Sequence, residues 1–403
     1  MDKCLQVAWY PGTEAIANQS NFIFSPMSLR AGLALLAAGT HSSTLRQLLS
    51  FLGSQDTHHL DVASARLLAN VSAWPQLSFA SAVFVDRTLR LTPEFVSSAA
   101  SPHRAAVRSV DFKNRPAAAL AEVNAFIERA TAGRLSNVLS EQWRTQGPAS
   151  LGNCPGSLPC VSDLALSNED AVNGTTKIVL ANGLHFKATT PSAATSAAAT
   201  ARPWWQYAES FDAPGLGFKV LQCFYKMAGR DGRLDFAAPC FCMLIFLPHD
   251  RDGIADLLRL AVTQLDFVMR CAPRREQLVC PCMVPKFKFS SGFDAASALR
   301  RVGLSAPFDK GAADLSGMVS NMPPEGLYVS AVRQKCAVEV DEEGTTAVAT
   351  MYAPTSPGYS LASKPPPPPM SFVADHPFMF AIVEYEKAEV LFLGHVMDPS
   401  KKD

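Results

Sequence analysis

The chain has 403 residues, of which 48% are hydrophobic and 18% charged, and its formal net charge at pH 7 is zero. A chain of this length can bury a large core and by length alone would allow two or three domains. The lack of a basic excess argues against nucleic acid as a partner, because that affinity rests largely on neutralising phosphates. No apolar run approaches about 18 residues, so we expect no membrane span and no membrane partner.

Repeating apolar patterns predict the elements in chain order. Runs rich in Ala, Leu and Ser predict helices over 27–52 and 116–139, with a strand over 79–85 between them. Beyond residue 175 strand patterns dominate, interrupted by helical stretches at 252–270 and 291–303. The predicted strands cover residues 177–187, 218–225, 241–247, 283–289, 327–340, 371–383 and 388–396. We therefore predict one α+β domain over residues 1–403, with helices packed on several sheets.

Two segments interrupt these patterns. Residues 145–170 are weakly hydrophobic and rich in Gly and Pro, and we interpret them as a disordered insertion. Residues 189–203 are a low-complexity segment of Ala, Thr and Pro.

The N-terminus and the cysteines bear on the compartment. Residues 1–11 hold too few apolar side chains for the core of a signal peptide, so we expect a cytoplasmic protein, with the extracellular space as the alternative. Ten cysteines at irregular spacing, without a Cys-x-x-Cys pair, are typical of structural thiols in a reducing compartment. We expect neither a metal nor an organic cofactor.

Nothing in the sequence predicts catalysis. There is no HExxH, GxSxG, P-loop or GxGxxG motif, and the eight histidines are scattered. The adjacent pair Asp375 and His376 could suggest a catalytic dyad, but neighbours along a strand point to opposite faces. We therefore predict that the protein is not an enzyme.

The most informative run is Asp341 to Met351, in which acidic residues are followed by small, uncharged ones. Small side chains at alternating positions would let an exposed loop enter a β-sheet as an extra central strand, because every second residue must face a packed layer. A flexible surface loop rich in alanine is the plainer interpretation of the same run.

Several further motifs decide between these two interpretations. Together with the run after Asp341 they resemble, in the same order, the serpin family, and Gln47–Gly53 and Phe372–Phe378 look most like plant serpins. The motifs are Asn21–Ser28, Leu33–Thr40, Thr44–Gly53, Asn173–Asn182, Met243–Pro248, Pro285–Phe289, Gly303–Phe308, Phe372–Ile382 and Glu389–Pro399. The resemblance implies about eight or nine helices on three β-sheets, and an exposed reactive-centre loop over residues 344–370.

The resemblance also assigns roles to residues. Spacing from Gly344 places the scissile bond at Gly358–Tyr359, or at Pro357–Gly358 if one residue is missing. Ser25, Ser28, Asn182 and Gln334 are candidates for a buried polar cluster under the main sheet. The hinge comprises Glu342, Glu343, Gly344, Thr345, Thr346, Ala347, Val348, Ala349 and Thr350, and the family signature comprises Phe372, Asp375, His376, Pro377 and Phe378.

Two functions follow from the resemblance. The first is suicide inhibition of a serine or cysteine endopeptidase by a monomer, in which the cut loop inserts into the main sheet before the acyl-enzyme is hydrolysed. The second is a non-inhibitory serpin-fold protein, acting as a protease substrate or binding module. Pro354 and Pro357 favour the second, because proline lacks the N–H that a central strand needs. The low-complexity 189–203 segment, where the family carries structured chain, favours it too.

Overall fold

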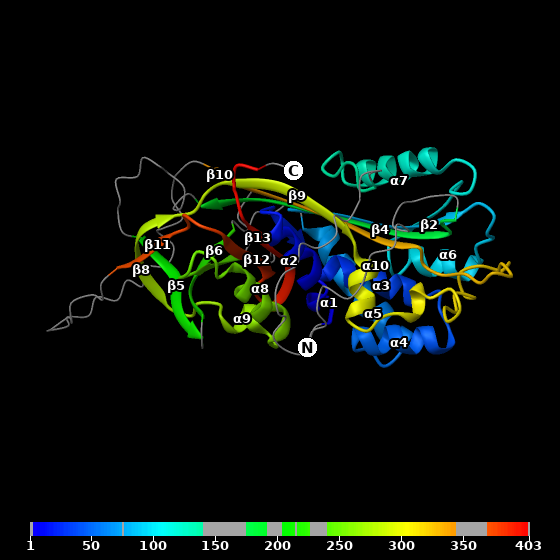
Figure 1. Cartoon of the computed structure of the whole chain (residues 1–403), viewed down its shortest axis with the longest axis horizontal. Coiled ribbons are helices and arrows are strands. Elements are labelled where there is room, and N and C mark those ends of the chain that lie inside the picture. The colour runs from blue at the N-terminus through cyan, green and yellow to red at the C-terminus, as the bar shows by residue number, and fades with distance from the viewer. Residues whose placement is uncertain are drawn as a thin grey trace.

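The computed structural model describes residues 3–74, 76–139, 175–191, 204–213, 216–225, 240–343 and 369–401. These residues form an α+β fold of two sheets and surrounding helices (Figure 1), which confirms the predicted fold class. The 145–170 segment, most of 189–203 and the loop from Gly344 to Pro368 lie outside the described residues. No described helix is long and apolar enough to cross a membrane.

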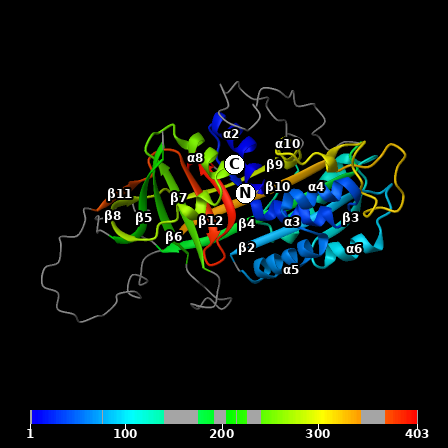
Figure 2. The same ribbon diagram turned by 90° about the horizontal axis from the view of Figure 1, so that it is seen from below.

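The five-stranded sheet has the order β3-β2-β4-β10-β9. At its centre β4 and β10 are parallel, while β2 and β9 are antiparallel to the central strand that each one borders. Figure 2 shows these strands running side by side with α3 and α5 across them. The strands are β2 (Leu77–Asp86), β3 (Ala106–Val110), β4 (Ile178–Pro191), β9 (Phe287–Asp294) and β10 (Ala331–Glu343).

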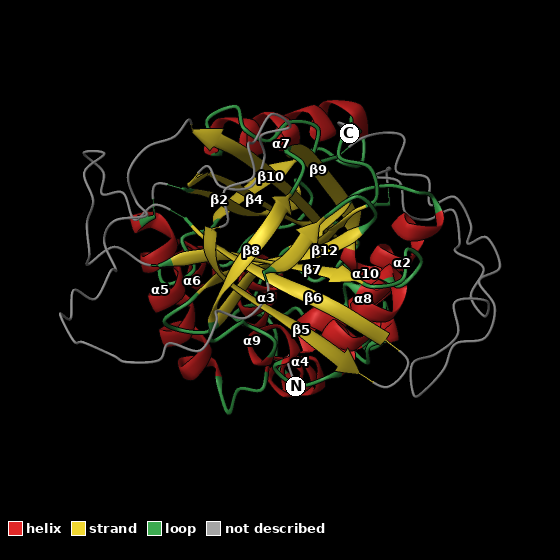
Figure 3. Ribbon diagram, turned by 90° about the vertical axis from the view of Figure 1, so that its left-hand side faces the viewer, coloured by secondary structure: helices red, strands yellow, loops and turns green. Residues whose placement is uncertain are grey.

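The second sheet has eight strands, in the order β1-β13-β12-β7-β6-β5-β8-β11. It bends around the end of the molecule that Figure 3 faces. The expected three separate sheets are not found among the described strands, because β5 pairs with both β6 and β8 and so joins two groups into one sheet. The strands are β1 (Phe22–Phe24), β5 (Trp204–Ala213), β6 (Leu216–Phe224), β7 (Phe241–Pro248), β8 (Glu276–Met283), β11 (Met370–Val373), β12 (Phe378–Glu384) and β13 (Glu389–Val396).

The described residues contain ten α-helices, two of them single turns. Helix α7 covers one face of the five-stranded sheet, and α3 to α6 lie on the opposite side (Figure 1). Side-chain caps help to fix several helix starts, as where Ser25 Oγ accepts from the Ser28 N–H ahead of Pro26. The helices are α1 (Lys3–Gln6), α2 (Trp9–Ala17), α3 (Pro26–Ala37), α4 (Ser42–Leu52), α5 (Thr57–Ala73), α6 (Pro93–Ala100), α7 (Pro116–Ala130), α8 (Ile254–Thr263), α9 (Phe267–Arg270) and α10 (Ala295–Arg301).

Aromatic side chains fill the space between the two sheets. Phe186 of β4 packs against Phe241 of β7 and Phe392 of β13, with ring centroids 6.1 and 6.0 Å apart. Trp74 meets Phe241 edge to face at 4.9 Å. Such contacts add to the area buried, so this layer ties the sheets into one body.

Several predicted elements have different bounds in the structure. The helical run predicted over 27–52 is two helices, α3 and α4, and the run over 116–139 is helical only as far as Ala130. The run over 252–270 is divided into α8 and α9, and the strand predicted over 327–340 begins at Ala331 and continues to Glu343.

The strand predicted over 283–289 is interrupted, because Pro285 cannot donate to a sheet and separates β8 from β9. The helix predicted over 291–303 begins only at Ala295, after Asp294 has ended β9 and accepted the Ala296 N–H as helix cap. The strand predicted over 371–383 is two strands, β11 and β12, that lie in different parts of the sheet.

Candidate functional site

The described residues place the base of the predicted loop at the end of β10. Glu342 and Glu343 are the last two residues of that strand, in register with Thr190 and Pro191 of β4. The rest of the hinge, Gly344 to Thr350, lies outside the described residues, as do the scissile candidates Pro357, Gly358 and Tyr359. On the far side of the loop, β11 begins at Met370.

The seam between β4 and β10 is closed along its whole length. Thirteen residue pairs match in parallel, from Ala331 with Val179 to Glu343 with Pro191. No strand separates the two in the described part of the sheet. A strand entering here would have to break this ladder and move β4 and β10 apart by about 5 Å, the spacing of one added strand.

The first turn of α3 is bonded to both sides of this seam. On the β10 side, the Gln334 amide accepts the Ser25 N–H at 3.3 Å and donates to the Ser25 carbonyl at 2.9 Å. On the β4 side, Asn182 Nδ2 donates to the Ser28 carbonyl at 3.2 Å. Gln334 and Asn182 are register partners across the seam, so the structure brings the four predicted cluster residues together.

The cluster has a fifth member that the sequence did not indicate. Ser81 of β2 donates its hydroxyl hydrogen to Asn182 Oδ1 at 2.8 Å. Ser28 takes part through its carbonyl, while its own hydroxyl is buried without a hydrogen-bond partner among the described residues. No spacing rule links Ser81 to Asn182, because strand pairing alone puts them opposite each other.

We expect the substitution Asn182→Ala to destabilise the protein by about 1 to 3 kcal/mol, because it leaves the buried Ser81 hydroxyl unpaired and removes the additional bond to the Ser28 carbonyl, which lies within α3. Urea unfolding measures the loss. The exposed Asn114→Ala, which removes an amide from a surface turn, is the control and should change stability by no more than about 0.5 kcal/mol. A loss below about 1 kcal/mol for Asn182→Ala would contradict the assignment.

Charged side chains cross the same seam on the face that carries α7. Glu339 of β10 accepts from Lys187 Nζ of β4 at 2.7 Å and from Lys288 Nζ of β9 at 3.1 Å. Ion pairs of this partly exposed kind contribute little each. Separation of β4 from β10 would break the pair with Lys187 and leave the pair with Lys288 intact.

The signature residues lie where β11 leads into β12. Phe372 and Phe378 are fully buried in the core between the sheets. Asp375, His376 and Pro377 form the connection between the two strands, and Asp375 accepts from Arg251 at 2.6 Å. The run therefore anchors the chain just after the loop.

The prediction that Asp375 and His376 point to opposite faces is wrong, because they lie in a turn and not along a strand. Their side chains contact each other, with His376 Nδ1 and Asp375 Oδ1 2.7 Å apart. The other ring nitrogen lies 2.7 Å from the Pro248 carbonyl oxygen, so both ring nitrogens are engaged. Neither is left to activate a nucleophile, and the pair serves to hold the turn against β7.

Two features of the described residues argue against metal binding and against reactive thiols. No group of three or more His, Cys, Asp or Glu side chains there could hold a metal ion. Burial raises the pKa of the Cys242 thiol to about 12 and that of Cys282 to about 11. These thiols therefore stay protonated and unreactive at neutral pH.

The closed β4–β10 seam, the buried polar cluster against it and the signature turn between β11 and β12 define an α+β protein of the serpin type. The family model for serpins (serine protease inhibitors) matches residues 8–154 and 165–399. The chain therefore belongs to the serpin family.

Plant proteins are among the most similar relatives. The chain is 59% identical to "Putative non-inhibitory serpin-10" and 54% identical to "Putative non-inhibitory serpin-Z11", both of Oryza sativa subsp. japonica, with all of each chain covered. It is 33% identical to Serpin-Z1B of Triticum aestivum, over 94% of this chain and 90% of the wheat protein.

Solved structures of other proteins share the fold of this chain. The native stressed conformation of Arabidopsis AtSerpin1 matches with a TM-score of 0.76 and 28% identity, over 99% of this chain and 97% of the other. Uncleaved ovalbumin, at 18% identity, matches with a TM-score of 0.70 over 99% of this chain and 98% of its own, and this likeness concerns the fold alone.

Proposed function

We propose that this serpin presents its loop to endopeptidases and is cut there as a substrate, without forming the covalent complex of an inhibitor. The observation that carries the proposal is the length of the β4–β10 seam. Because β10 spans thirteen residues, an inserted strand of equal length that starts at Thr345 would run to Pro357. Both Pro354 and Pro357 would then lie inside the sheet.

A central strand bonds to a neighbour on each side, so each proline would leave one backbone acceptor of β4 or β10 unpaired. Each unpaired buried group costs about 1 to 3 kcal/mol. If insertion stalls near Pro354, the inserted length would be too short, or insertion too slow, to distort the bound protease. Hydrolysis of the acyl-enzyme would then release the cut protein.

Two further observations support the proposal. Gln334 and Asn182 hold both sides of the seam to α3, so opening must give up buried hydrogen bonds. The two rice relatives that match over the full chain carry non-inhibitory in their names.

A second candidate is inhibition of a serine or cysteine endopeptidase, and one observation favours it. The hinge from Gly344 to Ala349 has a glycine followed by small or β-branched residues, which suit entry into a packed sheet. In this case Gly358 or Tyr359 would flank the cut bond, and the partner would be the target protease.

Incubation of the purified protein with a chymotrypsin-like, a trypsin-like and a papain-like protease separates the two. Intact-mass and SDS-gel analysis at short times should show cleavage within residues 351–364 and no protease adduct. An SDS-stable adduct, with a released peptide that starts near Tyr359, would overturn the proposal and establish inhibition.

A further inference from the structure

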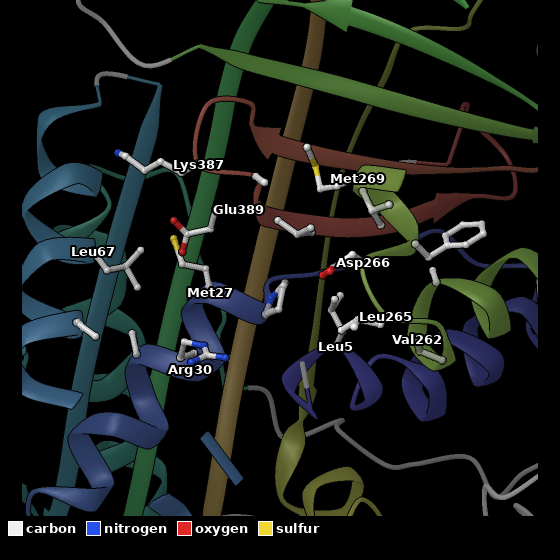
Figure 4. A pocket seen from close by; sticks show the side chains of 18 of the residues that line it. Leu5, Met27, Arg30, Leu67, Val262, Leu265, Asp266, Met269, Lys387 and Glu389 are labelled. Carbon is white, nitrogen blue, oxygen red and sulfur yellow. The ribbon is translucent and has the colours of Figure 1, made fainter. Parts of the chain in front are cut away.

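A cavity of about 430 Å³ lies where α3, α5, the link between α8 and α9 and the turn between β12 and β13 meet (Figure 4). Its volume is within the range of about 300 to 1,000 Å³ that is common for sites of drug-sized molecules.

Short side chains keep this cavity open. Alanines line it from three helices: Ala31 and Ala34 of α3, Ala63 of α5 and Ala261 of α8. The cavity also falls on the boundary of two apolar clusters, since Ala34 belongs to one and Met27 to the other. Protein interiors are otherwise packed as densely as organic crystals, so an apolar hollow of this size has space for a ligand.

The walls are more apolar than polar, and their charged side chains carry no net charge. Buried apolar side chains such as Met27, Leu60 and Phe267 form the wall, and Met27 and Met269 are flexible enough to adapt to a ligand's shape. The charged lining residues are two cations and two anions. They are Arg30, Lys387, Asp266 and Glu389.

Both cations are already engaged by the protein. Arg30 donates to the Leu52 carbonyl at 3.2 Å, and the Lys387 ammonium lies 5.5 Å from the centre of the Trp74 ring. Asp266 and Lys387 are exposed at the rim, so the charges meet water while the interior offers apolar surface. This distribution favours an uncharged ligand over an anion or a cation.

We propose that this cavity binds a neutral, hydrocarbon-rich small molecule. The test of this proposal does not depend on cleavage of the loop, because it measures probe binding to the uncleaved protein. The lining does include Pro26 and Met27, which lie between Ser25 and Ser28 of the polar cluster. Burial of the ligand's apolar surface would provide the affinity, at about 25 cal/mol per Å² before the costs of association.

Titration with the neutral fluorescent probe N-phenyl-1-naphthylamine tests the site. Ala63 is exposed on α5 and lines the cavity, so Ala63→Trp should fill it without disturbing the core, and should weaken probe binding at least tenfold. Ala69→Trp, also exposed on α5 but outside the lining, should bind as the wild type does. Equal affinity in the wild type and both variants, or no binding to the wild type, would overturn the proposal.

A second variant tests the same site in case Ala63→Trp does not fold. Leu265 is 55% exposed at the rim, so Leu265→Glu should fold while placing a charge at the entrance. We expect at least a tenfold loss of probe affinity, and unchanged affinity would overturn the proposal even if Ala63→Trp does not fold.

Competition by three compounds of one chain length tests the ligand class. Dodecanol should displace the probe at least tenfold more effectively than dodecanoate or dodecylamine. Displacement by either charged compound at equal or lower concentration would overturn the assignment to a neutral ligand.

Discussion

Replacement of Pro354 and Pro357 by alanine is expected to raise the melting temperature of the loop-cleaved protein by roughly 2 to 7 °C over that of the cleaved wild type. The two substitutions restore two backbone donors to a strand that enters the β4–β10 seam, which recovers about 2 to 6 kcal/mol. With an unfolding entropy of about 2.1 cal/mol/K per residue, a chain of 403 residues shifts its melting temperature by about 1.2 °C per kcal/mol, which gives the stated range. The measurement is calorimetry of both proteins after complete cleavage.

The proline run from Pro365 to Pro369 supplies a matched control. Pro367→Ala with Pro368→Ala also removes two prolines, but these residues lie beyond the length of chain that the seam can accept. This variant should melt, after cleavage, with the cleaved wild type. A cleaved wild type that already melts far above the uncleaved protein would show that its prolines do not stop insertion, and would refute the substrate proposal.

The double proline variant also separates two ways of losing inhibition. If the prolines alone prevent insertion, the variant should form SDS-stable adducts with a protease that cuts near Tyr359. If it gains thermal stability on cleavage and still forms no adduct, insertion is restored but too slow to trap the enzyme. The seam contacts of Gln334 and Asn182 would then be the next candidates for the delay.

The fold class was accessible from the sequence because strand alternation and helix periodicity are local properties. The first and last residues of individual helices and strands were harder to predict. Pro285 marks a break that its apolar neighbours concealed, and Asp294 ends a strand and caps a helix at once. The separation of β11 from β12 depends on which strands they pair with, and pairing partners are distant in sequence.

Prediction of the site residues was limited in the same way, because some contacts join residues that are distant in the sequence. Motif order was sufficient to nominate Ser25, Ser28, Asn182 and Gln334, and they lie together in the structure. Motif order could not nominate Ser81, which becomes a partner of Asn182 only when β2 pairs with β4. It also could not foresee that Asp375 and His376 contact each other, because the turn that brings their side chains together depends on where β11 ends.

Two buried histidines should make the protein lose stability as the pH falls from about 6.5 to about 4. Burial lowers the pKa of His395 to about 4, and burial with the nearby positive charge of Arg134 lowers the pKa of His185 to about 4. Lys288 and Lys187 act on His185 in the same direction as Arg134, and Glu339 opposes them. The side chains of both histidines carry a ring Nδ1 without a hydrogen-bond partner among the described residues.

Proton binding to the unfolded chain explains why the free energy of unfolding falls in acid. Between pH 6.5 and 4 the unfolded chain protonates both histidines while the folded protein keeps them neutral, so acid favours unfolding. At pH 5 the two together should lower the free energy of unfolding by about 3 to 4 kcal/mol relative to pH 7. Carboxylates with lowered pKa values, such as Asp86, contribute only at more acidic pH, and the raised pKa of Glu14 opposes the loss near the bottom of the window.

Urea unfolding at pH 7 and pH 5 measures this loss. His395→Gln and His185→Gln should each remove about 1.5 to 2 kcal/mol of it, whatever their effect on stability at pH 7, because each deletes one titrating group. The remainder includes the contribution of His103, whose pKa burial also lowers. An unchanged pH dependence in both variants would mean that other groups take up the protons. His185 lies next to the Lys187–Glu339 pair at the β4–β10 seam. If only His185→Gln weakens the pH dependence of the free energy of unfolding, the acid sensitivity belongs to the seam and not to the core around His395.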